Sequence, residues 1–69
     1  MNKDIIEGKW NEVKGKLKQQ WADLNDNDIG RLKGTRQELG GLLQKQFGYD
    51  KDRAEKEIDA FIDKNKWNS

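Results

Sequence analysis

The sequence contains no cysteine, no histidine and no proline among its 69 residues. Without cysteine no disulfide can form, so packing alone must stabilise the fold. Cysteine and histidine are also the usual ligands of zinc, copper and iron, and their absence argues against a site for these metals. We therefore expect neither a metal nor a cofactor.

Hydroxyl side chains are almost as scarce, and those present are Thr35, Tyr49 and Ser69. Without histidine or cysteine, a nucleophile and its activating base are hard to assemble from these residues. Carboxylates are plentiful, but pairs such as Asp26 and Asp28 are better explained as helix caps and solvated charges. The sequence therefore predicts a protein that is not an enzyme and has no catalytic residues.

The chain also lacks a long apolar run. Hydrophobic residues make up 32% and charged residues 39% of it, and no segment approaches the roughly 20 apolar residues that cross a membrane. Segment 1–7 has no signal-peptide core, so we expect a cytoplasmic protein. The length predicts one domain over residues 1–69 with a single modest core.

Apolar residues recur with the period of an α-helix. At about 100° per residue, Trp10, Val13 and Leu17 share one stripe of a first helix that we expect to run as far as Leu24. Similar stripes follow in later segments, so the sequence predicts an all-α fold. The residues expected to form the structural core are Trp10, Val13, Leu17, Trp21, Leu39, Leu43, Phe47, Ile58 and Phe61.

The opposite side of the first predicted helix carries small residues at intervals of seven. Gly8, Gly15 and Ala22 fall there, beside Lys9 and Lys16. Another helix can approach closely where side chains are small, so these five residues are our candidate interaction surface. The occupant that we consider first is an unidentified protein partner.

Glycine and the Asx residues divide the remaining chain. The polar cluster 25–28 is expected to end the first helix and start the next. A continuous helix beyond it would place Arg36 within the apolar stripe, so we expect a short helix over 27–33 and a longer one over 36–47. Gly48 is expected to end that helix in the left-handed conformation, and Asp50 to cap the last one.

The glycines also bear on stability. Six of the seven lie within or beside predicted helices, and each interior glycine lowers the free energy of unfolding by about 1 kcal/mol relative to alanine. We therefore expect a weakly stable fold, although glycines at helix ends or close contacts would reduce this cost. The pattern leaves open whether Trp67 closes the core or stays exposed.

A basic run interleaved with tryptophan offers limited support for binding nucleic acid. Its lysines are Lys9, Lys14, Lys16 and Lys18, and aromatic side chains beside lysines suit a single strand. Both nearby tryptophans, however, lie on the apolar stripe, and the chain as a whole balances 14 basic against 13 acidic residues. A solvated helix face explains the lysines better, and an interfacial membrane helix is a weaker alternative still.

The spacing Gly-x-Trp-x-x-x-Lys-Gly-x-x-Lys-x-x-Trp resembles the CsbD-like family of small bacterial stress-response proteins. The residues that carry this resemblance are Met1–Asp4, Gly8, Trp10, Lys14, Gly15, Lys16, Lys18, Gln20, Trp21, Leu24, Asp26, Asp28, Gly34, Arg36, Leu39, Gly41, Gln44, Phe47–Tyr49, Lys51, Asp52 and Ala54–Glu57. The resemblance implies a small bundle of about four helices, built as two crosswise-packed hairpins like SAM domains. It also implies expression under general stress, and it supplies no catalytic residue or ligand.

Three functions are compatible with the sequence. The first is a non-catalytic interaction module that binds a protein partner, and we expect it to be a monomer. The second is a hydrophilin-like protectant of macromolecules under osmotic or desiccation stress, which the mean hydropathy of −1.25 favours. Weak nucleic-acid binding through the basic first helix is the third.

Overall fold

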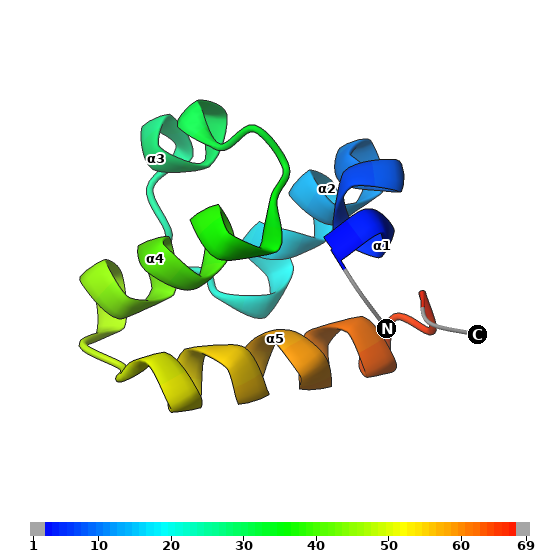
Figure 1. Cartoon of the computed structure of the whole chain (residues 1–69). Helices are drawn as coiled ribbons and strands as arrows, with labels where there is room; N and C mark the ends of the chain where they lie inside the picture. The colour runs from blue at the N-terminus through cyan, green and yellow to red at the C-terminus, as the bar shows by residue number, and fades with distance from the viewer. Residues whose placement is uncertain (1–2, 68–69) are drawn as a thin grey trace.

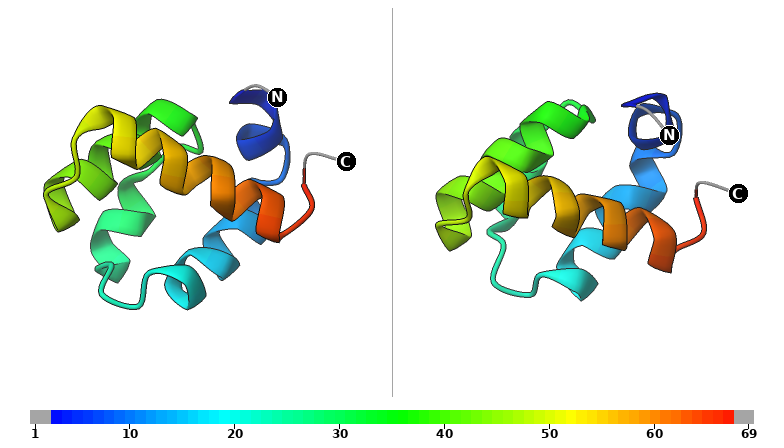
Figure 2. Two further views of the ribbon diagram at one scale, coloured as in Figure 1. Left: turned by 90° about the horizontal axis from the view of Figure 1, so that it is seen from below. Right: turned by 60° about the horizontal axis from the view of Figure 1, so that its bottom comes forward.

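The computed structural model describes residues 3–67, and it folds them into helices without a strand (Figure 1). The prediction of an all-α fold is therefore confirmed. The five helices are α1 (Lys3–Gly8), α2 (Trp10–Gln20), α3 (Asp26–Arg31), α4 (Arg36–Phe47) and α5 (Lys51–Lys64). In Figures 1 and 2, α4 and α5 run side by side as an antiparallel pair, and α1 and α2 lie toward the C-terminal end of α5. The likeness to SAM domains remains a prediction.

The first predicted helix is in fact two helices. The chain breaks at Lys9, whose φ of −118° and ψ of 26° lie outside the α-helical region and whose side chain makes no capping hydrogen bond. The break lets α1 turn relative to α2 (Figure 2), so that Ile6 is fully buried. The second helix also ends at Gln20, earlier than expected. Packing of Ile6 against the core therefore outweighs the continuity of the helical pattern.

Local hydrogen bonds explain where the later helices begin. Asn25 Oδ1 accepts from the Asn27 N–H at 2.7 Å before α3, and Asp50 Oδ1 accepts from the Arg53 N–H at 2.7 Å before α5. Capping at both places agrees with the sequence-based expectation. Gly48 ends α4 with a φ of 71°, also as predicted. The predicted bounds of α4 are observed, whereas α3 ends two residues before the predicted end of the short helix.

The start of α4 is fixed by a capping box that hydrophobic periodicity does not reveal. Thr35 Oγ1 accepts from the Glu38 N–H at 3.1 Å, and Glu38 Oε1 accepts from the Thr35 N–H at 3.4 Å. The same carboxylate oxygen accepts from the Lys33 N–H at 2.8 Å. Thr35-x-x-Glu38 is the signal that would have located this helix start without reference to Arg36.

Phe61 lies at the centre of the core. Its ring centroid is 5.0 Å from that of Trp21 and 5.1 Å from that of Trp67. The structure buries Val13, Leu17, Trp21, Leu39, Leu43, Ile58 and Phe61 from the expected core, and adds Ile6, Leu24, Ile29, Leu42, Ala54, Ile62 and Trp67. Trp10 and Phe47 are partly exposed and pack against the edge of this cluster. The core thus joins residues from all five helices or their ends.

The C-terminal end of α5 answers the open question about Trp67. The Lys66 N–H donates to Asp63 O at 3.1 Å, and the Trp67 N–H donates to Ile62 O at 3.2 Å. With Lys66 at a φ of 59°, these two bonds form a Schellman motif. The turn carries Trp67 back onto Phe61, and its Nε1 donates to Glu12 Oε2 at 3.2 Å.

Lys66 occupies a left-handed position that glycine adopts at lower cost, so we expect a gain in stability on substitution. Lys66→Gly should unfold with a free energy about 1 kcal/mol higher than Lys66→Ala. The two variants both remove the lysine side chain, so their difference isolates the backbone strain. Urea unfolding followed by tryptophan fluorescence measures it. Equal stability of the two variants would show that the turn carries no such strain.

Glu38 should make the stability of the fold depend on acidity. The Lys33 N–H, together with the Thr35 N–H and hydroxyl, holds the pKa of Glu38 below its ordinary value of 4.5 although partial burial opposes this effect. A lowered pKa contributes stability above the pKa of the unfolded state, and this contribution disappears as pH falls through the folded-state pKa. Between about pH 5 and about pH 3, the free energy of unfolding should therefore fall more steeply in the wild type than in Glu38→Gln. Parallel curves from urea unfolding would contradict this.

Candidate interaction surfaces

The five residues of the predicted interaction surface are all exposed, but they do not lie on one helix. Gly8 ends α1, Lys9 lies at the break, and Ala22 lies in the turn after α2. The expectation that a single helix carries all of them is therefore wrong, because the helix breaks at Lys9 and ends at Gln20. Only Gly15 and Lys16 stay together within α2.

The fold requires glycine at neither Gly8 nor Gly15, and of these two Gly15 lies inside α2. A Cβ built on Gly15 would meet no atom within 4 Å, and its φ is not positive. Val13 and Leu17 turn toward the core, and the helical spacing therefore turns Gly15 away from it. The outer face of α2, which we define by Gly15 with its exposed neighbours Asn11, Lys16 and Gln19, is the first candidate surface.

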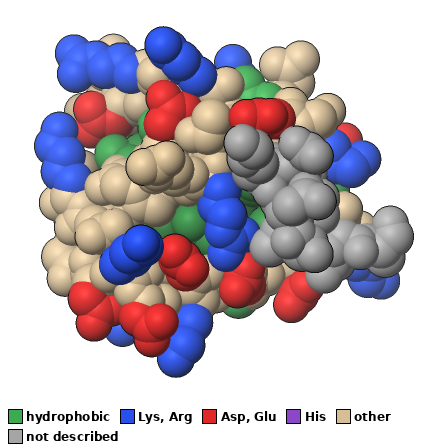
Figure 3. All heavy atoms as spheres, in the orientation of Figure 1, with side chains coloured by type: hydrophobic (Ala, Val, Ile, Leu, Met, Phe, Trp, Pro, Cys, Tyr) green, Lys and Arg blue, Asp and Glu red, His purple; other side chains and the backbone are tan. Residues whose placement is uncertain are grey.

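One lysine of the basic run, Lys18, is already engaged within the chain. Lys18 Nζ lies 3.1 Å from Asp26 Oδ1 and donates to Leu24 O at 3.2 Å. It lies in the last turn of α2, where a cation is stabilised by the helix dipole. Acidic and basic side chains are also intermingled on the face in Figure 3. The charge pattern therefore favours a solvated surface over a strand of nucleic acid.

The two tryptophans near these lysines are occupied by the fold. Trp21 is 7% exposed and contacts Phe61. Trp10 lies against Gly34, where the backbone has a φ of 104° and an added Cβ would come within 3.1 Å of Trp10 Cγ. Stacking of a nucleic-acid base on Trp21 would require the core to open, and one side of the partly exposed Trp10 is already covered by Gly34.

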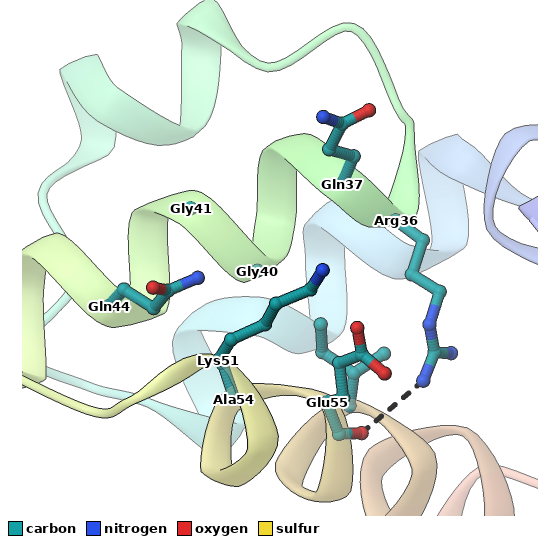
Figure 4. Close-up of a pocket in the computed structure, with 9 residues that line it drawn as sticks. Arg36, Gln37, Gly40, Gly41, Gln44, Lys51, Ala54 and Glu55 are labelled. Atoms are coloured by element: carbon teal, nitrogen blue, oxygen red, sulfur yellow. Dashed lines mark hydrogen bonds between the residues drawn. The ribbon is translucent and has the colours of Figure 1, made fainter.

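A groove between α4 and α5 forms the second candidate surface, and the sequence-based predictions do not include it (Figure 4). Its volume is about 620 Å³. Its lining includes small or apolar residues, namely Gly40, Gly41, Ala54 and Ile58. Long polar side chains border it, namely Arg36, Gln37, Gln44, Lys51 and Glu55. The adjacent glycines Gly40 and Gly41 were the feature of the sequence that could have indicated this groove. The groove itself forms only because α4 and α5 pack side by side.

Charges of both signs border this α4–α5 groove. Arg36 Nη2 reaches across it to Asp59 Oδ1 at 2.5 Å and to Glu55 O at 3.3 Å. Lys51 extends from the start of α5 toward Gly40 of α4 (Figure 4). Within residues 3–67, neither the Lys51 ammonium nor the Glu55 carboxylate forms a salt bridge.

The described part of the chain offers few groups for chemistry. Over residues 3–67, no set of three acidic side chains could hold a metal ion, and no helix is long and apolar enough to cross a membrane. Besides the lowered pKa of Glu38, the pKa of Arg53 is raised because its guanidinium bonds Glu57. Both shifts favour the charged forms, so neither creates a group that exchanges protons near neutral pH.

Substitutions at glycine should separate the positions that the fold needs from those that it does not. Gly15→Ala and Gly41→Ala should each raise the free energy of unfolding by about 1 kcal/mol, because alanine favours the helix and its Cβ meets nothing within 4 Å. Gly34→Ala should lower it, because of the positive φ and the contact with Trp10. Urea unfolding tests all three. A loss of stability at Gly15 or Gly41 would show that the fold uses these glycines.

The sequence is similar to known proteins over nearly its whole length. A family model described as CsbD-like matches residues 4–56. UPF0337 protein pc0632 of Protochlamydia amoebophila is 47% identical over 66 residues, which cover 96% of this chain and 100% of the relative. UPF0337 protein YjbJ of Escherichia coli is 48% identical over 61 residues, 88% of each chain. UPF0337 protein PA4738 of Pseudomonas aeruginosa is 44% identical over 64 residues, which cover 93% of this chain and 98% of the relative.

Proposed function

The chain belongs to the CsbD-like family, and we propose that it serves the general stress response of a bacterium as a non-catalytic module that binds a protein partner. The observation that supports this is Gly15. A glycine inside a helix lowers stability by about 1 kcal/mol, and here no contact within the chain requires it. A requirement outside the chain explains why such a residue occupies the outer face of α2.

The chemistry of the outer face of α2 suits the backbone of another helix. Glycine removes the side chain that would hold a partner at a distance, so the two backbones can approach closely. Asn11 and Gln19 lie one helical turn on either side of Gly15, and both are exposed. Their amides both donate and accept hydrogen bonds. Lys16 adds a cation that suits an acidic side chain of the partner.

A hydrophilin-like protectant is the alternative, which the polar composition favours and which requires no defined surface. Weak binding of nucleic acid ranks below both, because Lys18 and the tryptophans already have partners within the chain. The protectant makes a distinct prediction. It should preserve the activity of an enzyme through drying better than an equal mass of a neutral carrier protein, and a substitution at Gly15 should not matter.

Gly15→Leu should remove partner binding while the fold survives. Immobilised protein is exposed to lysate from osmotically stressed cells, and the retained proteins are quantified by mass spectrometry. Capture of the specific partner should fall about tenfold or more, because a leucine side chain separates the two backbones. The size corresponds to about 1.4 kcal/mol of binding free energy.

Gly30→Leu is the matched control. Gly30 is also an exposed helical glycine whose added Cβ would meet nothing within 4 Å, but it lies in α3. Circular dichroism should show helical spectra for both variants. Equal capture by the wild type and both variants would remove the outer face of α2 from consideration. Equal loss in both variants would indicate a general effect of adding an apolar surface residue.

A further inference from the structure

We propose that the α4–α5 groove is a self-association surface, which packs against the same groove of a second copy of this chain across a two-fold axis. The charges of α5 give the first argument. This helix contains three opposite-charge pairs at i,i+4 spacing, and two of them form: Arg53–Glu57 at 3.0 Å and Asp52–Lys56 at 3.5 Å. The third, Lys51 with Glu55, does not form within residues 3–67.

The unformed pair is the one that borders the groove. Lys51 instead extends over the groove toward Gly40, while the backbone of Glu55 accepts from Arg36 (Figure 4). Both charged groups are therefore available to a molecule that enters the groove.

A second copy of the chain matches this arrangement of charges. A two-fold interface uses the same patch on both molecules, so the patch must be complementary to itself. Lys51 and Glu55 lie one helical turn apart and carry opposite charges. When two α5 helices cross antiparallel near these residues, Lys51 of one copy lies beside Glu55 of the other, and the reciprocal pair forms at the same time.

A glycine in the lining of the groove gives the second argument. Gly41 is an exposed residue inside α4, and an added Cβ would meet nothing within 4 Å. The fold of one copy therefore does not require glycine at position 41. The neighbouring Gly40 differs, because a Cβ added to it would lie 3.7 Å from Ile58 Cδ1. Gln37 and Gln44 also line the groove, and amides can donate to and accept from their own kind across a two-fold axis.

The size of the molecule sets the strength of this dimer. The chain exposes 4558 Å², and a standard interface buries about 800 Å² on each partner. A dimer interface centred on the α4–α5 groove reaches this buried area only if most of the exposed surface of α4 and α5 contacts the second copy. We therefore expect weak association that leaves the protein monomeric when dilute, in keeping with the monomer expected from the sequence, and that weakens with added salt.

Charge reversal tests the reciprocal pairs directly. Sedimentation velocity of the wild type, from about 10 µM to about 1 mM, should show the average mass rising toward that of a dimer. Lys51→Glu alone and Glu55→Lys alone should each stay monomeric, because like charges then meet. An equimolar mixture of the two variants should associate again, since each unlike pair is restored between different molecules.

Two further variants make the result specific to the groove. Lys56→Glu makes the same charge change on the same helix away from the groove, and it should leave association unchanged. Gly41→Leu adds a large side chain to the lining of the groove without altering charge and should prevent association, while circular dichroism confirms the helical fold of each variant. A wild type that stays monomeric at every concentration overturns the proposal. So does a mixture that fails to associate, or a Gly41→Leu variant that associates like the wild type.

This proposal is independent of the proposed partner. Gly15→Leu should not change the sedimentation of the protein, and Lys51→Glu should not change the partner captured by the outer face of α2. Loss of self-association by Gly15→Leu would instead show that the second copy uses α2, and would overturn the assignment to the groove.

Discussion

The contact of Phe61 with Trp21 and Trp67 is the interaction on which the arrangement of the chain depends. It joins the end of α2, the body of α5 and the segment after α5. A chain of this length buries few large side chains, so the position of α5 is set by these rings together with Ile58 and Ile62. Once α5 is held there, α4 packs beside it as an antiparallel neighbour, and the α4–α5 groove follows from that pairing.

The parts of the fold that sequence predicts are those that local chemistry decides. Asn25, Gly48 and Asp50 act as expected because capping depends on a few neighbouring backbone groups. The break at Lys9 carried no such signal: it has no capping side chain, and it is produced by the distant packing of Ile6. Trp67 could not be placed for a related reason, since its position depends on a left-handed residue that is lysine, not glycine.

The same distinction between local and tertiary causes applies to the two candidate surfaces. Gly15 could be identified from its spacing in one helix, but its place on a continuous face with Gly8 and Ala22 depended on a helix that does not exist in that form. The α4–α5 groove requires two helices that are paired by tertiary contacts, so no pattern within either helix predicts it. The glycines divide in two groups. Gly34 and Gly48 are explained by positive φ angles within the chain, whereas neither a positive φ nor a close contact explains Gly8, Gly15, Gly30 and Gly41.

The two surfaces face different directions, and this has a consequence for binding. Gly15 lies opposite Val13 and Leu17, the residues of α2 that are buried in the core. The groove lies between α4 and α5, on the side of these two helices that faces away from α2 (Figure 4). Pairing of two copies through the groove therefore leaves both outer faces of α2 accessible. If the partner carries two copies of its binding site, a dimer can bind both of them. The second binding event is then intramolecular, and its effective concentration depends on the distance and orientation of the two α2 faces. Because weak dimerisation responds to the amount of protein present, accumulation of the protein would raise partner affinity without any change in either contact.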